Sequence, residues 1–433
     1  MYELVSKLLV YRNIGKESIL FKLSEIIKDF DDGEYDRDEL RSRILDEVHE
    51  LLNLATEYGF DKNLWRDYIA YLIAMTENPF TIVSEKRGKT KGSVNSFVKS
   101  DMSVFRQLME YDFEKLENEL SLDCFSLITH YDSVKKEDRF INKNASIRIR
   151  ELSDRLSLAK NDDEFFEEVI SFYGKYGVGM FGMNRAFRVS QKGDSILVPI
   201  AATSTVTLSD LFGYESQKEA LIKNTESFLN GNSANNVLLY GDAGTGKSTS
   251  VKALLNLYYE SGLRIIEVYK HEFKYLPEII SIIKNRNYRF IIYMDDLSFE
   301  SAETEYKYLK AVIEGDLEVK PENVLIYATS NRKHLIRESF ADRKETDDDD
   351  IHKNDTIAER MSLSDRFGLT ISYFKPERKE FYGIVKSLYK KDLKNGNMTD
   401  EELFLEADRF AMRNGGMSGR TAQQFVDYLV SLS

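Results

Sequence analysis

The chain has 433 residues, of which 42% are hydrophobic and 31% are charged. This length exceeds that of one typical domain, and the composition excludes a disordered chain. With only 5 prolines and 23 glycines, it also excludes collagen-like and low-complexity chains. The formal net charge of −13 argues against a surface that attracts nucleic acid throughout, although a local basic patch could still bind it.

The cysteine and histidine content restricts the chemistry further. The single cysteine, Cys124, excludes an intrachain disulfide framework and any zinc site with several cysteines. The 5 histidines are scattered and form no metal-ligand cluster in the sequence. These features favour a reducing, cytoplasmic compartment.

Neither a signal peptide nor a membrane span is expected. The apolar run of Met1–Asn13 is interrupted by Glu3, Lys7 and Arg12, and no small-residue cleavage site follows it. A transmembrane helix needs roughly 18 or more consecutive apolar residues, and the chain has no such run. We therefore expect no membrane partner.

The first part of the chain, residues 1–185, has the pattern of a mainly helical domain. Breaks between helices are expected at Asp31–Gly33 and at Glu85–Ser93. The stretches with apolar residues at helical spacing are Ile19–Phe30, Leu40–Leu52, Leu64–Met75 and Phe105–Leu120.

The pattern of apolar residues changes after residue 185. Residues 186–207 read as a linker that contains two short strands around the turn Lys192–Asp194. Strands and helices then alternate over residues 208–375, which predicts an α/β domain with a parallel sheet covered on both faces. The expected strands are Asn236–Tyr240, Leu263–Tyr269, Phe290–Asp295, Val324–Ser330 and Leu369–Phe374. Residues 376–433 are expected to be entirely helical.

One motif dominates the chemistry. Gly241–Ser248 (GDAGTGKS) matches the pattern G-x-x-x-x-G-K-[ST], with an apolar strand before it and a helical segment after it. In such a loop, backbone N–H groups surround phosphates, Lys247 reaches the β- and γ-phosphates, and the Ser248 hydroxyl ligates Mg²⁺. The alternative is a chance glycine-rich turn, which the strand and helix on either side argue against. The residues expected to bind the nucleotide are Gly241, Asp242, Ala243, Gly244, Thr245, Gly246, Lys247, Ser248 and Thr249.

A second apolar strand, within Phe290–Asp296, ends in two acids. We expect Asp295 to lie on the metal side, and Asp296 to orient or deprotonate the attacking water. Glu300, four residues later, is a second candidate for the base. The alternative is a buried strand followed by a turn with solvated acids.

Three polar residues further along the chain could complete the site. Asn331 follows the strand Val324–Ser330 and could contact the γ-phosphate, or it could cap the next helix. Arg366 could face the nucleotide of a neighbouring subunit, or it could pair with Asp365 or Asp355. Arg420 opens the last helix and could bend back onto the phosphates, or it could be solvated.

In this order, the motifs resemble those of the AAA+ ATPase module. The resemblance identifies Asn331 with sensor 1, Arg366 with the arginine finger and Arg420 with sensor 2. Leu208–Glu215 looks like the segment that contacts adenine in such proteins. The resemblance to the AAA+ module implies an α/β domain with a five-stranded parallel sheet and a phosphate-binding loop (P-loop) at Gly241–Ser248. It also implies a helical lid at residues 376–433, and ATP and Mg²⁺ as cofactors.

More closely, the chain resembles a bacterial family of predicted AAA+ ATPases catalogued as a domain of unknown function. The similarity rests on LLYGDAGTGKSTSVKALL, DDLSFE, ATSNRKHL and SLSDRFGL, and covers at least Val198–Leu429. Many AAA+ proteins have glutamate where this chain has Asp296. The shorter side chain holds the base farther from the γ-phosphate, so hydrolysis could be slow.

These motifs lead to a ranked set of functions. The first is an ATPase that remodels an unidentified macromolecular partner, with protein favoured over nucleic acid because the chain is acidic. An arginine finger has little use in a monomer, so this function predicts a homo-oligomer, either a ring or a nucleotide-dependent assembly. The second is an ATP-gated switch with slow or incidental hydrolysis. A P-loop kinase ranks last, because it leaves the sensor, finger and lid residues unexplained.

Three other segments invite functional interpretations that we rank below structural ones. The acidic run Asp347–Asp350, within the loop 339–361, is interpreted as solvated rather than as a metal site. Phe273 and Tyr275 are interpreted as packing residues rather than pore aromatics. The basic segment Lys86–Lys91 is interpreted as a solvated loop, since no aromatic stacking platform accompanies it.

Overall fold

A computed structural model of the chain describes residues 1–33, 35–89, 92–133, 143–191, 195–300, 303–314, 321–333, 335–336, 363–393 and 398–432. The expected turn Lys192–Asp194 and the acidic loop 339–361 lie outside these described residues. The chain divides into two compact units. The helical unit comprises Met1–Asn184 with Pro199–Ala202, and the α/β unit comprises Arg185–Val198 with Thr203–Ser433.

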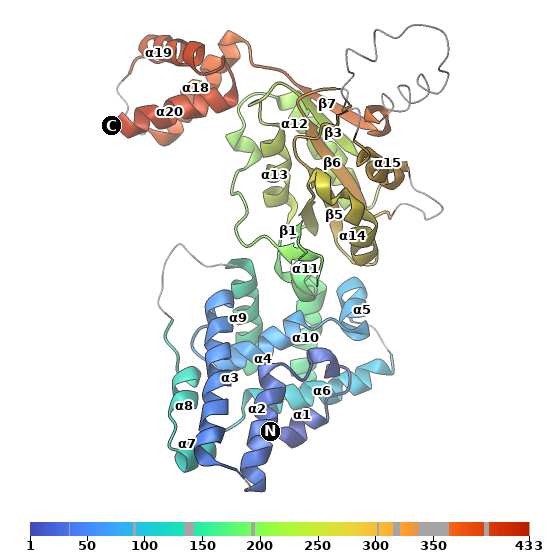
Figure 1. The fold of residues 1–433 in the computed structure, drawn as a ribbon, viewed down its shortest axis with the longest axis vertical. Coiled ribbons are helices and arrows are strands. Elements are labelled where there is room, and N and C mark those ends of the chain that lie inside the picture. Colours follow the sequence, from blue (N-terminus) through green and yellow to red (C-terminus); the bar gives the residue numbers. More distant parts are fainter. Residues whose placement is uncertain are drawn as a thin grey trace. The chain divides into compact units, whose positions relative to one another are not determined.

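The helical unit contains helices of very different lengths (Figure 1). Its elements are α1 (Tyr2–Ser6), η1 (Arg12–Ile14), α2 (Ile19–Asp32), α3 (Arg37–Tyr58), α4 (Leu64–Met75), α5 (Pro79–Arg87), α6 (Val94–Met109), α7 (Glu114–Leu120), α8 (Cys124–Thr129), α9 (Lys143–Ser157), α10 (Asp162–Tyr176) and α11 (Gly179–Met183).

Local signals at the ends of α2 and α3 explain where these helices begin and stop. The Ser18 side chain accepts a hydrogen bond from the N–H of Phe21, and Asp36 caps α3 in the same way. Gly33 and Gly59 end the two helices in the left-handed conformation, with φ of 78° and 62°. The apolar stripe predicted for Ile19–Phe30 is buried along α2.

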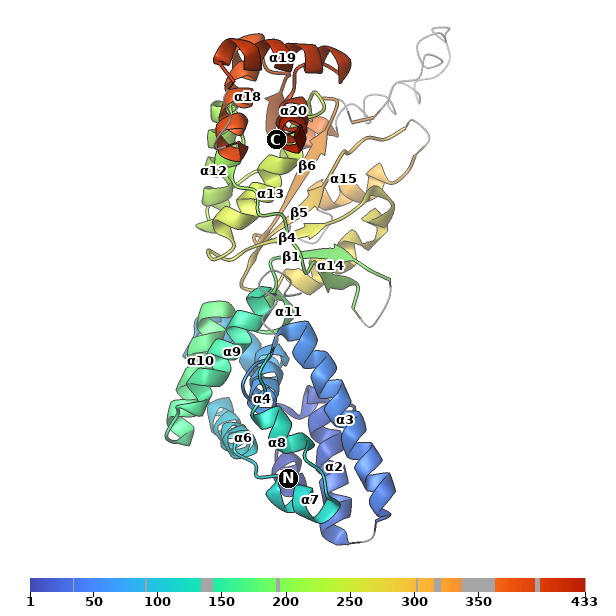
Figure 2. The same cartoon turned by 90° about the vertical axis from the view of Figure 1, so that its left-hand side faces the viewer.

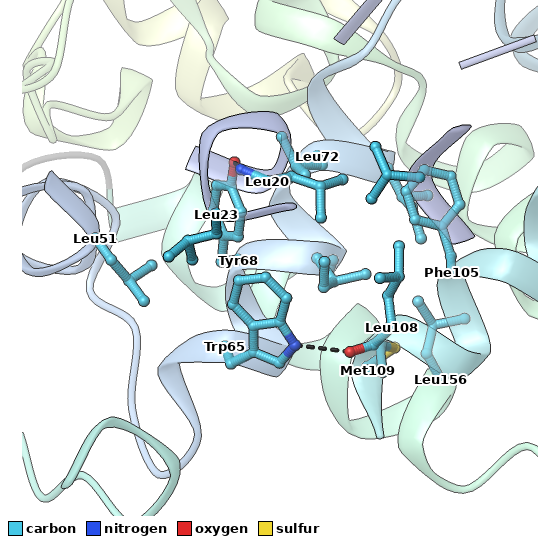
Figure 3. Packing of buried hydrophobic residues seen from close by; sticks show 14 of the residues in the cluster. Leu20, Leu23, Leu51, Trp65, Tyr68, Leu72, Phe105, Leu108, Met109 and Leu156 are labelled. Atoms are coloured by element: carbon cyan, nitrogen blue, oxygen red, sulfur yellow. Dashed lines mark hydrogen bonds between the residues drawn. The ribbon is translucent and has the colours of Figure 1, made fainter. Parts of the chain in front are cut away.

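Large aromatic side chains fill the core of the helical unit (Figure 3). The indole Nε1 of Trp65 donates a 2.7 Å hydrogen bond to the carbonyl oxygen of Leu108. The Tyr68 hydroxyl accepts a 3.0 Å hydrogen bond from the N–H of Leu20. Each buried polar tip thus has a partner, so the rings contribute their apolar area without an unpaired donor.

The structure corrects one predicted helix, Phe105–Leu120. Instead of one stretch, α6 ends and α7 begins within it. The intervening Phe113 is buried and stacks on Phe125 with ring centroids 4.2 Å apart. The Asp112 carboxylate accepts a 2.8 Å hydrogen bond from the N–H of Glu114 and starts the new helix. We attribute the break between α6 and α7 to the burial of the Phe113 ring, although the apolar spacing alone predicts one continuous helix.

The α/β unit is built on one sheet with strand order β2-β1-β4-β5-β6-β3-β7. Its strands are β1 (Ala186–Val189), β2 (Leu197–Pro199), β3 (Val237–Gly241), β4 (Leu263–Glu267), β5 (Arg289–Met294), β6 (Val324–Ser330) and β7 (Leu369–Tyr373). All five pairings between β1, β4, β5, β6, β3 and β7 are parallel. The sheet is thus mostly parallel, as predicted.

Within the described residues the sheet has seven strands, rather than the five expected. The two additional strands, β1 and β2, come from the segment interpreted as a linker. Ala186 lies opposite Ile265, so β1 extends the sheet beyond β4. This pairing satisfies backbone groups along a strand that would otherwise be an exposed edge.

Helices cover both faces of the sheet. Helices α12 (Glu215–Leu229) and α13 (Lys247–Tyr258) lie on one face, and α14 (Leu276–Ile283) and α15 (Tyr306–Glu314) on the other (Figures 1 and 2). All seven residues of β6 are buried, as expected for a central parallel strand. The short helical turns are η2 (Leu208–Asp210), η3 (Lys270–Tyr275) and η4 (Ser364–Arg366).

The chain ends in helices α18 (Arg378–Asp392), α19 (Asp400–Arg413) and α20 (Gly419–Leu432) (Figure 2). Phe381, Val385, Ala407 and Phe425 belong to their shared hydrophobic core. Across the described residues of both units, no helix has the combination of length and apolarity that a bilayer span requires.

Candidate nucleotide site

A cavity of about 760 Å³ lies at the carboxyl ends of the central strands of the α/β unit. Its walls come from the P-loop, from the ends of β5 and β6, from the segment around η2, and from helices α18 and α20. Residues from these parts are Thr205, Val206, Asp210, Leu211, Phe212, Tyr214, Ala243–Thr249, Asp295, Asp296, Thr329, Asn331, Ile384, Leu388, Lys391, Gly419, Arg420, Gln423 and Gln424.

The P-loop adopts a conformation that requires glycine at particular positions. Gly241 has φ of 130°, and a Cβ there would lie 2.0 Å from the carbonyl oxygen of Tyr373. Gly246 has φ of 94°, and a Cβ there would lie 2.5 Å from a methyl of Leu211. Backbone conformation and close neighbours therefore both disfavour a side chain at Gly241 and at Gly246.

Lys247 is the first residue of α13 and lies almost buried beneath the loop. Its Nζ donates hydrogen bonds to the carbonyl oxygens of Gly241 (2.9 Å) and Asp242 (2.6 Å), and to Oδ1 of Asn331 (3.1 Å). Burial lowers the pKa of this ammonium, and the nearby carboxylates, Asp296 foremost, oppose that shift. The amine is therefore held in place by three acceptors at the edge of the cavity.

Ser248 and Asp295 form the candidate metal pair. The Ser248 hydroxyl donates a 2.7 Å hydrogen bond to Oδ1 of Asp295, which also accepts one of 2.6 Å from the Thr329 hydroxyl. Burial raises the pKa of Asp295, but these hydrogen bonds outweigh it and hold the pKa below the usual range. An ionised carboxylate next to a hydroxyl is an oxygen donor set that suits Mg²⁺.

A protein-only metal site is not seen in the part of the chain that the structure describes. No group of three or more histidine, cysteine or acidic side chains there could hold an ion. Mg²⁺ usually keeps several waters and binds through one or two carboxylates and substrate phosphates. The pair fits that mode of binding.

Asp296 lies at the cavity wall in an unusual backbone conformation, with φ of 50°. Its N–H donates a 2.9 Å hydrogen bond to the Thr329 hydroxyl, and its Oδ1 accepts a 2.7 Å hydrogen bond from Nδ2 of Asn331. Glu300, the other candidate base, is absent from the described residues that line the cavity. The geometry favours Asp296.

The Asn331 side chain contacts both Lys247 and Asp296. Its amide oxygen accepts from Lys247, and its amide nitrogen donates to Asp296. The amide of Asn331 thus bridges the Lys247 ammonium and the Asp296 carboxylate. This arrangement supports the role predicted from its place after β6 over that of a helix cap.

The two predicted arginines differ in position. Arg420 lines the cavity, and its backbone N–H donates a 3.1 Å hydrogen bond to the carbonyl oxygen of Gly244. Arg366, in η4, forms an ion pair with Glu314 and is not among the described residues that line the cavity. Among the described residues, the ion pair of Arg366 is thus with Glu314 and not with Asp365, and Asp355 lies outside these residues.

Two residues of the predicted phosphate loop, Gly241 and Asp242, are absent from the described cavity wall. Their carbonyl oxygens hold Lys247, and the Asp242 carboxylate accepts a 2.8 Å hydrogen bond from the N–H of Lys375. These two residues therefore hold Lys247 and the loop in position without lining the cavity.

Phe273, interpreted from the sequence as a packing residue, is buried and packs edge-on against Phe299.

Three cavity residues were not indicated by any motif in the sequence. Ile384, Leu388 and Lys391 follow one another at helical spacing on α18 and line the cavity. Lys391 forms an ion pair with Asp210, whose pKa falls to about 2 because of hydrogen bonds from Lys391 and from Thr207. The helical period of these residues was visible in the sequence, but it indicates only a shared face.

A comparison with family models identifies the family of the chain. The model described as "Protein of unknown function (DUF815)" matches residues 182–433, more than half of the chain. The chain belongs to this family. Its P-loop on a mostly parallel sheet gives this DUF815 protein the architecture of a P-loop nucleotide-binding domain. No curated protein matches it.

The solved structures that match this DUF815 protein are distant from it. The Thermotoga maritima RuvB Holliday junction branch migration motor has 16% sequence identity and a TM-score of 0.35, over 52% of this chain and 64% of that one. The replication initiator DnaA, bound to AMPPCP and single-stranded DNA, has 18% identity and a TM-score of 0.37, over 53% and 66%. The chain thus spans less than two thirds of each of these structures.

Proposed function

We propose that this DUF815 protein is an AAA+ ATPase that binds Mg-ATP and hydrolyses it to remodel a macromolecular partner. The observation that supports this best is the hydrogen-bonded chain from Lys247 through Asn331 to Asp296, beside the pair of Ser248 and Asp295. All five side chains meet at the wall of one cavity. These are the groups that phosphoryl transfer to water requires.

Each of these residues has a proposed role in binding. The N–H groups of Ala243–Thr249 surround the phosphates at the amino end of α13, where the helix dipole favours an anion. Lys247 exchanges its carbonyl partners for phosphate oxygens. Ser248 and Asp295 would hold Mg²⁺, which would neutralise negative charge on the phosphate oxygens. Arg420 adds a positive charge from α20.

Hydrolysis then depends on the second acid. The oxygen of a water molecule forms a bond to the γ-phosphorus, the bond to the bridging oxygen breaks, and ADP leaves. The Asp296 carboxylate accepts the proton of that water. Asn331, which already donates to Asp296, orients both groups.

The same proposal extends to assembly and domain roles. Arg366 would act on the nucleotide of a neighbouring copy and exchange its contact with Glu314 for phosphate oxygens. The chain would therefore act as a homo-oligomer in the cytoplasm. Residues 208–375, together with strands β1 and β2 from the segment 186–207, would form the motor domain, 376–433 the lid, and 1–185 the domain that holds a protein partner.

A second candidate is an ATP-gated switch with slow hydrolysis. The observation that favours it is the short side chain of Asp296, which is engaged by Asn331 and holds its carboxylate close to the backbone. ATP occupancy alone would then set the conformation. Turnover distinguishes the two, since a switch retains ADP whereas a motor releases it.

The decisive experiment measures ATP turnover across a protein concentration series, with particle mass recorded in ATP and in ADP. Lys247→Ala should abolish turnover and weaken ATP binding by more than about 10-fold, because it removes a charge-assisted contact to phosphate. The matched control is Lys223→Ala, an exposed lysine on α12. Normal ATP affinity and turnover in Lys247→Ala would refute the site. Negligible turnover on a monomer would favour the switch.

A further inference from the structure

Thr329 was given no role by the sequence motifs, although it lies in the quoted stretch ATSNRKHL. It lies on the central strand β6, is 1% exposed, and contributes to the cavity wall. Strands β5 and β6 run parallel, with Met294 opposite Ala328. The next residue on each strand is therefore Asp295 and Thr329, so the register brings this hydroxyl to the acidic end of β5.

This single hydroxyl contacts both acids. It donates a 2.6 Å hydrogen bond to Oδ1 of Asp295 and accepts a 2.9 Å hydrogen bond from the backbone N–H of Asp296. A hydroxyl has one donor and two acceptor sites, so both bonds can exist at once. The side chain of one acid and the backbone of the next are thereby tied to one atom.

The backbone at Asp296 needs such support. Its φ of 50° lies in the left-handed region, which residues other than glycine adopt far less readily, with aspartate among the more tolerant of them. Two neighbouring bonds hold the same segment against β6: the N–H of Leu297 donates to the Thr329 carbonyl at 2.7 Å, and the Ser330 hydroxyl donates to the Leu297 carbonyl at 2.7 Å. The strained turn sends consecutive acids in different directions.

We infer that Thr329 is a positioning residue that sets different directions for the two acids, aiming Asp295 at Ser248 and Asp296 at the cavity and Asn331. This inference rests on the proposed ATPase function. Valine has nearly the same shape but lacks the hydroxyl, so it breaks both bonds. Serine keeps the hydroxyl and loses only a methyl group.

The experiment compares Thr329→Val, Thr329→Ala and Thr329→Ser in the full chain, with Thr370→Val on β7 as a control at an exposed strand threonine. We expect kcat to fall about 10- to 100-fold in the valine and alanine variants, because misplaced reacting groups cost about that much. The KM for ATP and its Kd at saturating Mg²⁺ should change less than about threefold. The serine variant and the control should keep at least about half of the kcat.

A second measurement does not depend on turnover. The Mg²⁺ concentration needed for half-maximal ATP binding should rise about threefold or more in Thr329→Val and Thr329→Ala, because the Asp295 carboxylate is then no longer oriented toward Ser248. It should be unchanged in Thr329→Ser. If the wild type binds Mg-ATP but does not hydrolyse it, the ATPase proposal fails and this measurement still tests Thr329.

Two results would overturn the inference. One is a kcat for Thr329→Ala that equals that of Thr329→Ser, since these variants differ by one hydroxyl. The other is an unchanged Mg²⁺ requirement in both the valine and the alanine variants. Thermal unfolding of each variant shows which of them are folded. Because alanine and serine are both smaller than threonine, their comparison stands even where the valine variant does not fold.

Discussion

The close approach of β7 to the P-loop gives a prediction that can be made quantitative. Gly241→Ala would place a Cβ 2.0 Å from the carbonyl oxygen of Tyr373, at a residue with φ of 130°. Gly262→Ala provides a matched control, because Gly262 has φ of 95° but no atom within 4 Å of the added Cβ. Both substitutions place an alanine at a positive φ, and only Gly241→Ala adds a collision with backbone.

The magnitudes follow from these two terms. The backbone conformation costs an alanine about 1–2 kcal/mol at either position. At Gly241, β7 or the loop must also shift, and overpacking of this kind costs about 1–3 kcal/mol more. We therefore expect the free energy of unfolding of the α/β unit to fall by about 1–3 kcal/mol more in Gly241→Ala than in Gly262→Ala.

Thermal unfolding measures this difference. In the wild type, the transition that ATP shifts identifies the α/β unit, because a ligand stabilises the fold to which it binds. For a domain of about 150–250 residues, 1 kcal/mol corresponds to about 2–4 °C in Tm. Gly241→Ala should therefore melt about 2–12 °C below Gly262→Ala and lose ATP affinity. Equal Tm values for the two variants would refute the packing argument.

Further predictions concern the site itself. Asp296→Asn should retain ATP binding and lower kcat at least about 100-fold in steady-state assays; an unchanged rate would exclude it as the base. Mixtures of Arg366→Ala and Lys247→Ala subunits should regain part of the activity, and confirmed mixed oligomers without rescue would contradict a role in trans. Lys391→Met should speed nucleotide release up to about fivefold in stopped-flow at low salt, because an exposed ion pair with Asp210 contributes about 0.2–1 kcal/mol. Identical release rates at low salt would exclude that contact.

Local signals account for what the sequence predicted well. The P-loop lies where its glycines require it, and the apolar runs that precede Gly241 and Asp295 are strands β3 and β5. These features depend on residues that are close in sequence. The acids and Asn331 could be placed near the P-loop because the carboxyl ends of parallel strands meet at one edge of a sheet.

Long-range pairing accounts for what the sequence did not predict. Strand β1 joins the sheet because Ala186 pairs with Ile265, and nothing local to either residue indicates the other. The contacts of Thr329 depend on the register between β5 and β6, which a single residue does not encode. Arg366 pairs with Glu314 rather than with the nearer Asp365, because the fold brings together elements that are distant along the chain.

The hydrogen bond between the N–H of Arg420 and the carbonyl of Gly244 has a mechanical consequence. It fixes the amino end of α20 against the phosphate loop and leaves the other end of this 14-residue helix away from it. At 1.5 Å per residue the helix is roughly 20 Å long, so a 10° rotation about the fixed end moves the far end by about 3.5 Å. If nucleotide binding turned α20 about this contact, the helix would act as a lever arm, and its far end would move farther than the phosphate loop itself.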